Sequence, residues 1–146
     1  MGLPPSSQEI RLTRRQTLQL SGEGKCFACG EQNPIGLKMR FIAEGKTCRS
    51  ELVIGENYQG FDDIAHGGII ATALDEIMAR LWLDLGYNAL TAKLEVRYLK
   101  PVPVGEKITL QAELWRHKGR LLETAARAWL PDGTLAAEAK ASSLSV

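Results

Sequence analysis

Asp75 is the residue of this 146-residue sequence whose type and position best suit it for chemistry. In a helix over residues 68–85 it falls at the edge of the apolar stripe, about 120° from the centre at 100° per residue. The residues three and four positions away on either side are uncharged, so no helical partner neutralises it. Glu76 points farther from the stripe and precedes Arg80 by four residues, which is typical of a surface ion pair. We therefore assign Asp75 to chemistry and Glu76 to structure; the alternative for Asp75 is an ordinary solvated carboxylate.

His66-Gly67-Gly68 precedes this helix and is a second candidate for chemistry. Gly67 and Gly68 allow a ligand to approach the backbone, and the first-turn N–H groups are unpaired and carry the positive end of the helix dipole. Such donors suit a developing oxyanion, and Asp75, two and a half turns along, can face the same end. The alternative is that the glycines only permit a tight turn, with His66 capping the helix or filling the interior.

A cationic turn is the third candidate and lies at residues 115–120. Its charges, Arg116, Lys118 and Arg120, can hold the phosphates of a nucleotide-bearing substrate. The alternative is a solvated hairpin tip.

Cys26 and Cys29 have the spacing of a zinc or redox pair, but zinc needs about four ligands and there is no second cysteine pair. Cys48, His66 and His117 would have to converge on them, so we expect no metal site. A thioredoxin-like role is disfavoured because no βαβ pattern surrounds the pair. The sequence also contains no Ser-His-Asp elbow, P-loop or dinucleotide fingerprint.

The elements that position these residues follow from hydrophobic periodicity. Alternation predicts strands at 37–41 and 48–54 joined by a Glu44-Gly45 turn, and helical spacing predicts one long helix over 68–85, ended by Gly86. Four further strands are predicted at 91–99, 107–116, 121–130 and 134–145. This order, with many alanines on the strand faces, indicates a curved antiparallel sheet around one helix. Residues 1–25 read as a flexible arm and residues 26–146 as one domain.

Composition narrows the class of protein. Hydrophobic residues make up 45% and charged residues 24%, which excludes a disordered chain and a coiled coil. A net charge of +1 argues against nucleic acid as a partner. No apolar run approaches the ~20 residues of a membrane span, and the N-terminus lacks the apolar core of a signal peptide. With three cysteines expected to stay reduced, we expect a cytoplasmic protein.

Together these motifs resemble a known family. They comprise Cys26-Phe27-Ala28-Cys29-Gly30, Asn33-Pro34-Ile35-Gly36-Leu37, Tyr58-Gln59-Gly60, Ala65-His66-Gly67-Gly68, Asp75, Thr91 and Tyr98-Leu99-Lys100-Pro101. Residues 26–146 are similar to the hotdog-fold acyl-CoA thioesterases of the PaaI-like, phenylacetate-pathway type. The resemblance implies an α+β hotdog fold, in which a curved antiparallel sheet wraps one long helix. It also implies a homodimer, or a dimer of dimers, with active sites between subunits.

The resemblance implies roles for single residues in hydrolysing acyl-CoA or aryl-CoA thioesters. Asp75 would be the nucleophile or general base, and the Gly67 N–H would polarise the thioester carbonyl in a turn shaped by His66. Thr91 would assist the carboxylate from the opposite subunit. Some relatives carry an asparagine where this sequence has Gly60, so Gln59 or Asn57 would have to supply an amide. No cofactor or metal is required.

Three alternatives stay open on the sequence. One is a hotdog module that binds acyl-CoA without turning it over, which the missing asparagine favours and Asp75 disfavours. Another is a metal-binding or redox module built on Cys26 and Cys29. A hotdog dehydratase is disfavoured by the spacing of Asp75 from the His-Gly-Gly motif. The acyl group depends on pocket shape, which one sequence does not determine.

Overall fold

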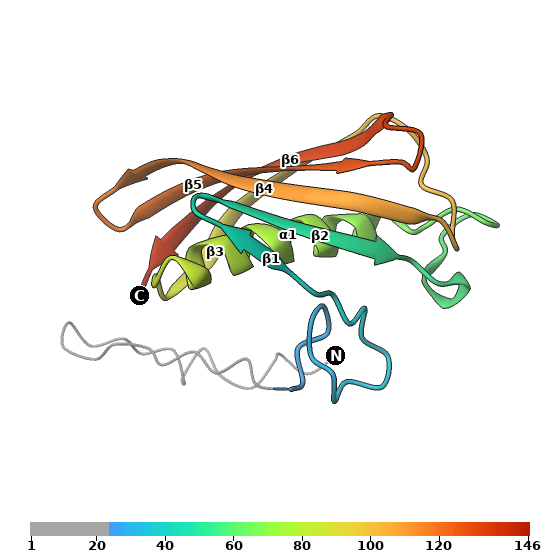
Figure 1. Cartoon of the computed structure of the whole chain (residues 1–146), viewed down its shortest axis with the longest axis horizontal. Helices are drawn as coiled ribbons and strands as arrows, with labels where there is room; N and C mark the ends of the chain where they lie inside the picture. Colours follow the sequence, from blue (N-terminus) through green and yellow to red (C-terminus); the bar gives the residue numbers. More distant parts are fainter. Residues whose placement is uncertain (1–23) are drawn as a thin grey trace, which may run out of the picture.

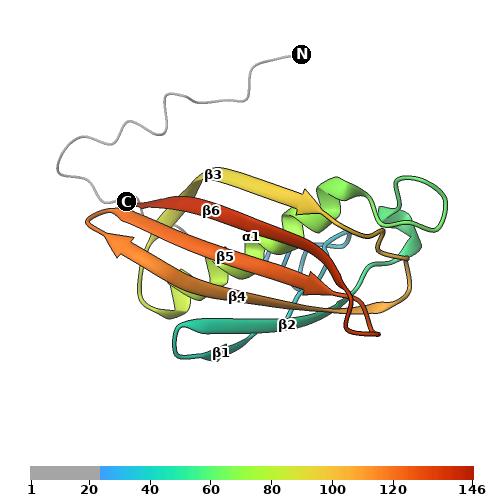
Figure 2. The ribbon, with the colours of Figure 1, turned by 90° about the horizontal axis from the view of Figure 1, so that it is seen from above.

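A six-stranded antiparallel sheet curves around one long helix in residues 24–146, the part of the chain that the computed structural model describes (Figure 1). The elements are β1 (Ile42–Glu44), β2 (Thr47–Val53), the 3-10 helix η1 (Glu56–Tyr58), α1 (Gly67–Asp84), β3 (Ala89–Tyr98), β4 (Lys107–Lys118), β5 (Leu121–Trp129) and β6 (Leu135–Ser145). Strand order in the sheet is β1-β2-β4-β5-β6-β3, so β1 and β3 are the edges. Seen from above, α1 lies under the middle strands (Figure 2). The predicted order of elements and the α+β hotdog fold are confirmed.

Helix α1 forms where the periodicity predicts it, within one residue at each end. Its buried residues recur at intervals of three and four and face the sheet: Ile70, Ala73, Leu74, Ile77, Met78, Leu81 and Trp82. Gly86 follows the helix with φ of 91°, the left-handed conformation that stops a helix at little cost in glycine. Burial of this face fixes the rotation of α1 about its own axis. It therefore also determines which residues of α1 face the edge of the sheet.

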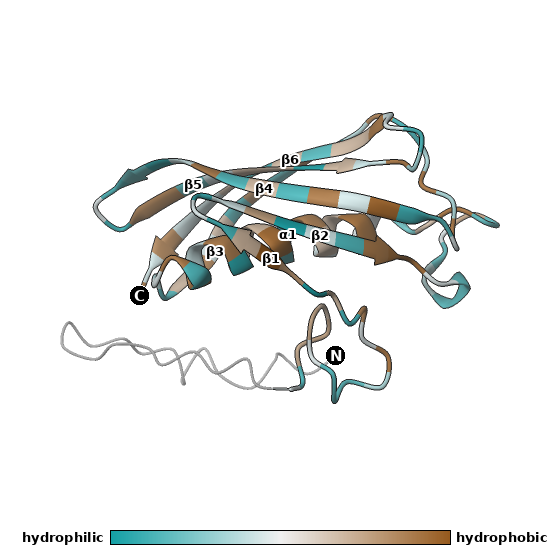
Figure 3. Cartoon of the chain, in the orientation of Figure 1, coloured by the Kyte–Doolittle hydropathy of each residue, from teal (hydrophilic) through white to brown (hydrophobic). Residues whose placement is uncertain are grey.

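Small side chains line the inner face of the sheet, and in Figure 3 apolar and polar positions alternate along the strands. Buried alanines of β4, β5 and β6 include Ala112, Ala126, Ala128, Ala137, Ala139 and Ala141. Because an alanine occupies little volume, the sheet can approach and curve over the larger side chains of α1. The expectation that the alanine-rich strands form a curved sheet around one helix is confirmed.

The strand predicted at residues 37–41 is wrong, and β1 begins only at Ile42. Leu37 N and Met39 N instead donate to Phe27 O at 2.8 Å and Ala28 O at 2.9 Å, so this segment pairs with the cysteine turn. Lys38 between them has φ of 54°, which interrupts an extended strand. The turn predicted after Glu44 is confirmed, with Gly45 at φ of 59°.

Two further expectations concern the N-terminal residues and membrane-spanning segments. The predicted flexible arm at 1–25 falls almost entirely outside the described residues. Within residues 24–146, the structure contains no helix that combines the length and the apolar character of a membrane span.

Candidate active site

His66 caps the start of α1, and its side chain accepts from Gly68 rather than from Gly67, the first residue of the helix. Its Nδ1 accepts a hydrogen bond from Gly68 N at 2.9 Å, and its carbonyl accepts from Ile69 N at 2.9 Å. A Cβ on Gly68 would lie 3.1 Å from that ring nitrogen, so Gly68 serves the cap. Within residues 24–146, no acceptor faces the Gly67 N–H. The positive end of the helix dipole is therefore presented through Gly67 rather than Gly68.

Tyr98, at the end of β3, covers the other side of Gly67. Its hydroxyl donates to Gly67 O at 2.6 Å, and a Cβ on Gly67 would lie 3.4 Å from the tyrosine ring. A largely apolar hollow of about 370 Å³ opens here, lined by Phe61 and Leu99 among others. Our sequence reasoning did not assign Tyr98 or Phe61 to the site. The feature of the sequence that could have indicated Tyr98 is its position as an aromatic residue at the end of a predicted strand, shortly before Pro101.

Asp75 lies half-buried at the middle of α1 and contacts β3. Thr91 Oγ1 donates to Asp75 Oδ1 at 2.9 Å, within the same chain. The expectation that Thr91 reaches the carboxylate from an opposite subunit is therefore wrong for this contact. Because only residues 85–88 join α1 to β3, the strand runs back along the helix, with Thr91 beside Asp75 and Tyr98 beside Gly67.

A bulge in β3 turns Thr91 toward the helix. Thr91 and Tyr98 are seven residues apart and would face opposite sides of a regular strand. The pairing with β6 shifts between Thr91 and Lys93, so one extra residue is inserted and both side chains point to the inner face. Because of the bulge, Thr91 at the start of β3 contacts Asp75 and Tyr98 at its end contacts Gly67.

Gly67 and Asp75 do not meet within one chain. They are eight positions apart in the helix, which corresponds to about 12 Å along the axis at 1.5 Å per residue. The carbonyl group of a thioester is much shorter than that, so Gly67 and Asp75 of one chain cannot both contact the same carbonyl. The expectation that Asp75 faces the same helix end as the oxyanion donor is therefore wrong for a single chain.

The amides predicted to replace the missing asparagine have other surroundings. Gln59 Oε1 accepts a hydrogen bond from Asp63 N at 2.9 Å and so holds its own loop. Asn57 is exposed on η1. Gly60 packs against His66, where a Cβ would lie 3.3 Å from the His66 Cα. A substrate role for Gln59 and Asn57 stays a prediction.

The cationic turn between β4 and β5 lies at the opposite end of α1 from His66. His117 Nδ1 is 3.0 Å from the Tyr87 hydroxyl, just beyond the end of the helix. Arg116 pairs with Glu123 at 3.6 Å, and Arg120 Nε donates to Ser145 O at 3.0 Å. Both arginines are thus partly engaged, while Lys118 is exposed at the tip.

The predicted Glu76–Arg80 ion pair is wrong. Arg80 Nε instead pairs with Asp84 at 2.9 Å, and its guanidinium lies 5.6 Å from the centre of the Phe41 ring. Glu76 Oε1 accepts from Cys26 Sγ at 3.7 Å. A tertiary contact with a residue 50 positions away has replaced the helical one.

The thiols differ in environment. Burial, followed by the neighbouring Glu76 carboxylate, raises the pKa of Cys29 above its ordinary range. Burial and then the Asp84 carboxylate raise the pKa of Cys48 to about 11. Among the described residues, the group that surrounds Cys26 and Cys29 includes Glu76 and not Cys48, His66 or His117.

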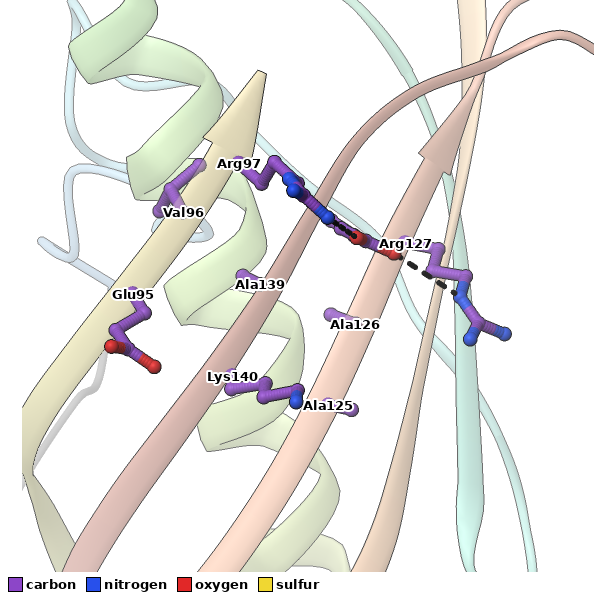
Figure 4. Close-up of a pocket in the computed structure, with 9 residues that line it drawn as sticks. Glu95, Val96, Arg97, Ala125, Ala126, Arg127, Ala139 and Lys140 are labelled. Atoms are coloured by element: carbon purple, nitrogen blue, oxygen red, sulfur yellow. Dashed lines mark ion pairs between the residues drawn. The ribbon is translucent and has the colours of Figure 1, made fainter. Parts of the chain in front are cut away.

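A further hollow of about 430 Å³ lies on the outer face of the sheet, with α1 on the far side of the strands (Figure 4). Arg97 and Arg127 both pair with Glu138 across it, at 3.7 Å and 3.9 Å. Because the sheet separates this hollow from α1, it makes no contact with Asp75 or Gly67.

Comparison with known proteins defines the class to which this fold and site belong. The Thioesterase superfamily model matches residues 63–137, from the loop before His66 to the first residues of β6. The chain belongs to the thioesterase superfamily. The matched segment contains the helix cap, Asp75, Thr91 and Tyr98.

Individual relatives agree with that assignment. Acyl-coenzyme A thioesterase THEM4 of Mus musculus is 34% identical over 68 residues, which cover 47% of this chain and 29% of that protein. A crystal structure of a thioesterase superfamily protein superposes with a TM-score of 0.76 at 26% identity, covering 83% of this chain and 60% of that one. The E. coli PaaI protein from the phenylacetic acid degradation operon superposes with a TM-score of 0.71 at 14% identity, covering 75% and 80%. The match to THEM4 thus spans less than a third of its length.

Proposed function

We propose that the protein hydrolyses acyl-CoA or aryl-CoA thioesters, with Asp75 as catalytic carboxylate and the Gly67 N–H as oxyanion donor. The observation that carries the proposal is the hydrogen bond of 2.9 Å by which Thr91 holds a half-buried Asp75 on the same helix whose N-terminus offers an unpaired N–H. Membership of the thioesterase superfamily supports it. Acyl-CoA thioesterase activity in THEM4 supports the substrate class.

Thioester hydrolysis places negative charge on the carbonyl oxygen as the nucleophile adds. A backbone N–H aimed at that oxygen contributes about 3 kcal/mol of transition-state stabilisation, and the helix dipole acts in the same direction. The Thr91 hydroxyl occupies Asp75 Oδ1, which fixes the carboxylate and leaves Oδ2 for the reaction. Thr91 is thus a positioning residue.

Asp75 can act in two ways that give the same products. As nucleophile, its oxygen adds to the carbonyl and CoA leaves as the thiolate, after which water hydrolyses the acyl-aspartyl anhydride. As general base, Asp75 takes a proton from water while the water oxygen adds to the carbonyl, and the proton passes to the departing sulfur. Either route converts a thioester and one water into an acid and a thiol.

Two chains are needed to assemble this site, because Gly67 and Asp75 are about 12 Å apart along one helix. Thr91 and Tyr98 lie on either side of the middle of β3, near Leu94. If β3 pairs antiparallel with its copy about a two-fold axis at that point, Thr91 of one chain falls opposite Tyr98 of the other. Since Thr91 contacts Asp75 and Tyr98 contacts Gly67, the carboxylate of one chain then approaches the oxyanion donor of the other.

The exposed edge of β3 supports this pairing. In residues 24–146 the strand pairs only with β6, so its other edge offers backbone donors and acceptors. Apolar side chains along and just beyond it are 36% to 53% exposed: Leu90, Leu94, Tyr98 and Leu99. An exposed apolar edge strand favours pairing with another chain. We infer a homodimer, and a dimer of dimers stays a prediction.

Structural neighbours support a CoA ligand and the two residues. A Streptococcus mutans protein with 16% identity was crystallised with acetyl-CoA. A Streptococcus pneumoniae hypothetical thioesterase of the same fold was crystallised as an aspartate-to-alanine and a threonine-to-alanine variant, at positions sixteen residues apart. Asp75 and Thr91 have the same separation. The exposed Arg116, Lys118 and Arg120 are our proposed contacts for CoA phosphates.

Hydrolysis of a panel of aliphatic and aromatic acyl-CoAs, followed by thiol release, tests the proposal. We expect Asp75→Asn to be slowed by about 10²-fold or more while still binding CoA esters. Asp84→Asn, the matched change at the far end of the same helix, should keep its activity. If wild type and Asp75→Asn bind CoA esters and neither turns over any member, the protein is instead an acyl-CoA-binding module, a role that Gly60 in place of asparagine favours.

A further inference from the structure

Two thiols and a carboxylate converge on the side of α1 away from Thr91. Ligand atoms of Cys26, Cys29 and Glu76 all lie within 4.8 Å of one another, and all three residues are half-buried. Cys26 and Cys29 come from the loop before β1, and Glu76 from the middle of the helix. The catalytic proposal uses none of them.

The cysteine loop is built as a tight turn that only glycine can close. Gly30 N donates to Cys26 O at 2.8 Å, and a Cβ at Gly30 would lie 2.4 Å from Cys26 N and 2.5 Å from Gly24 O. Gln32 N donates to Gly24 O at 2.7 Å and closes the loop further. The turn therefore holds the two cysteines side by side at the Cys-x-x-Cys spacing that many zinc sites use.

The distances suit a metal ion at the centre of the group. Bonds of about 2.3 Å to sulfur and about 2.1 Å to oxygen, arranged as a tetrahedron, put ligand atoms about 3.6–3.8 Å apart. Cys26 Sγ and Glu76 Oε1 are 3.7 Å apart. The remaining pairs of ligand atoms also lie within 4.8 Å of one another, and binding of a shared ion would draw them closer.

The charges around Glu76 also favour a bound cation. The helical neighbour that would neutralise Glu76 is Arg80, but Arg80 pairs with Asp84 and lies against Phe41. Across residues 24–146, no lysine, arginine or histidine forms an ion pair with Glu76. Two potential thiolates and a carboxylate thus meet without a protein cation.

We propose that Cys26, Cys29 and Glu76 bind one Zn²⁺ ion, with a water molecule as the fourth ligand. Two thiolates with one carboxylate favour zinc over the hard cations Mg²⁺ and Ca²⁺, which prefer oxygen ligands alone. The ion ties the cysteine loop to α1 one residue after Asp75. Because Glu76 faces Cys26 while Asp75 faces Thr91, the ion is structural and takes no part in thioester chemistry.

Metal content of the full chain, purified and kept reduced, tests the proposal without reference to activity. We expect about one zinc per chain by elemental analysis in wild type and in Cys48→Ala, whose cysteine lies outside the group. Cys29→Ser should lose the zinc, and Glu76→Gln should bind it at least tenfold more weakly. Zinc should also raise the Tm of wild type and leave the Tm of Cys29→Ser unchanged.

A second measurement needs no variant and holds even if Cys29→Ser fails to fold. Co²⁺ added to metal-free wild type should give a thiolate-to-metal charge-transfer band and the visible spectrum of a tetrahedral ion. Three outcomes overturn the proposal: no metal bound by reduced wild type, equal zinc in folded Cys29→Ser, or a cobalt spectrum without thiolate ligation. A Cys26–Cys29 disulfide forming in air with no metal bound in the reduced state would assign the pair to redox chemistry instead.

Discussion

In the proposed mechanism Gly67 acts through its backbone N–H, so its contribution can be separated from that of any side chain. It is the first residue of α1, a position where proline is tolerated because the N–H has no helical partner. His66 before it has φ of −60° and ψ of 135°, which a following proline allows. Proline therefore removes the donor while keeping the helix start.

Gly67→Pro should lower kcat by about 10²–10³-fold, the usual cost of losing an oxyanion donor. Gly67→Ala is the matched control, because it adds a Cβ at ordinary contact distance from Tyr98 and keeps the N–H. We expect Gly67→Ala to stay within about tenfold of wild type. Steady-state kinetics on folded variants checks this, and equal activities for the two would show that the N–H is not the oxyanion donor.

Thr91 is expected to act only through its hydroxyl. Thr91→Val keeps the shape and removes the hydrogen bond to Asp75, which should lower kcat about tenfold with little change in KM. Thr91→Ser restores the hydroxyl and should recover most of the rate. A serine variant as slow as the valine variant would contradict the positioning role.

At the scale of elements, α1 is held by packing on the sheet rather than by its termini alone. Cys48 on β2 is fully buried, and its thiol is held protonated by burial and by Asp84 at the end of the helix. Its pKa rises from 9.0 in the unfolded chain to about 11 in the folded one. Between these values the folded state binds more protons than the unfolded state, so stability falls as pH rises.

This gives a pH-dependent prediction for the contact between helix and sheet. The stabilisation from the Cys48 thiol should be complete below pH 9 and lost as pH rises through about 11. Urea unfolding of wild type and Cys48→Ala at pH 8 and pH 10.5 measures it, because other titrating groups cancel in the difference. Wild type should lose more stability than Cys48→Ala. Parallel losses would mean that the thiol does not titrate with folding.

At the scale of the whole molecule, the proposed site belongs to a pair of chains. The proposed two-fold axis near the middle of β3 would make an isologous interface, so that the dimer would contain two copies of the site. One variant supplying Gly67 and another supplying Asp75 should therefore complement each other. In a mixed dimer, one of the two sites contains both intact residues.

Mixing Gly67→Pro with Asp75→Asn after dissociation and reassociation should recover about one quarter of wild-type activity per chain, since about half of the dimers are mixed. The same two proteins mixed without exchange should stay inactive. Recovery is measured as thiol release, with mixed dimers verified by differently tagged chains. Mixed dimers that show no recovery would place both groups in one chain and refute the shared site.

Much of this molecule was predictable from sequence because it depends on local geometry. The apolar spacing between Ile70 and Trp82 sets the buried face of α1, and with it the position of Asp75 at the edge of that face. His66 as the helix cap and Gly86 beyond the helix end follow from the same local rules. The last four strands also agree closely, because alternation and turn residues are short-range signals.

Tertiary structure decided what depends on residues far apart in sequence. The bulge before Lys93 depends on pairing with β6, and it puts Thr91 on the same face of the strand as Tyr98, where Thr91 reaches Asp75. Glu76 faces Cys26 rather than Arg80 because the loop before β1 folds onto the helix. The periodicity of a helix predicts the direction in which each side chain points about the helix axis. Which residue of another element it contacts there depends on how the whole chain packs.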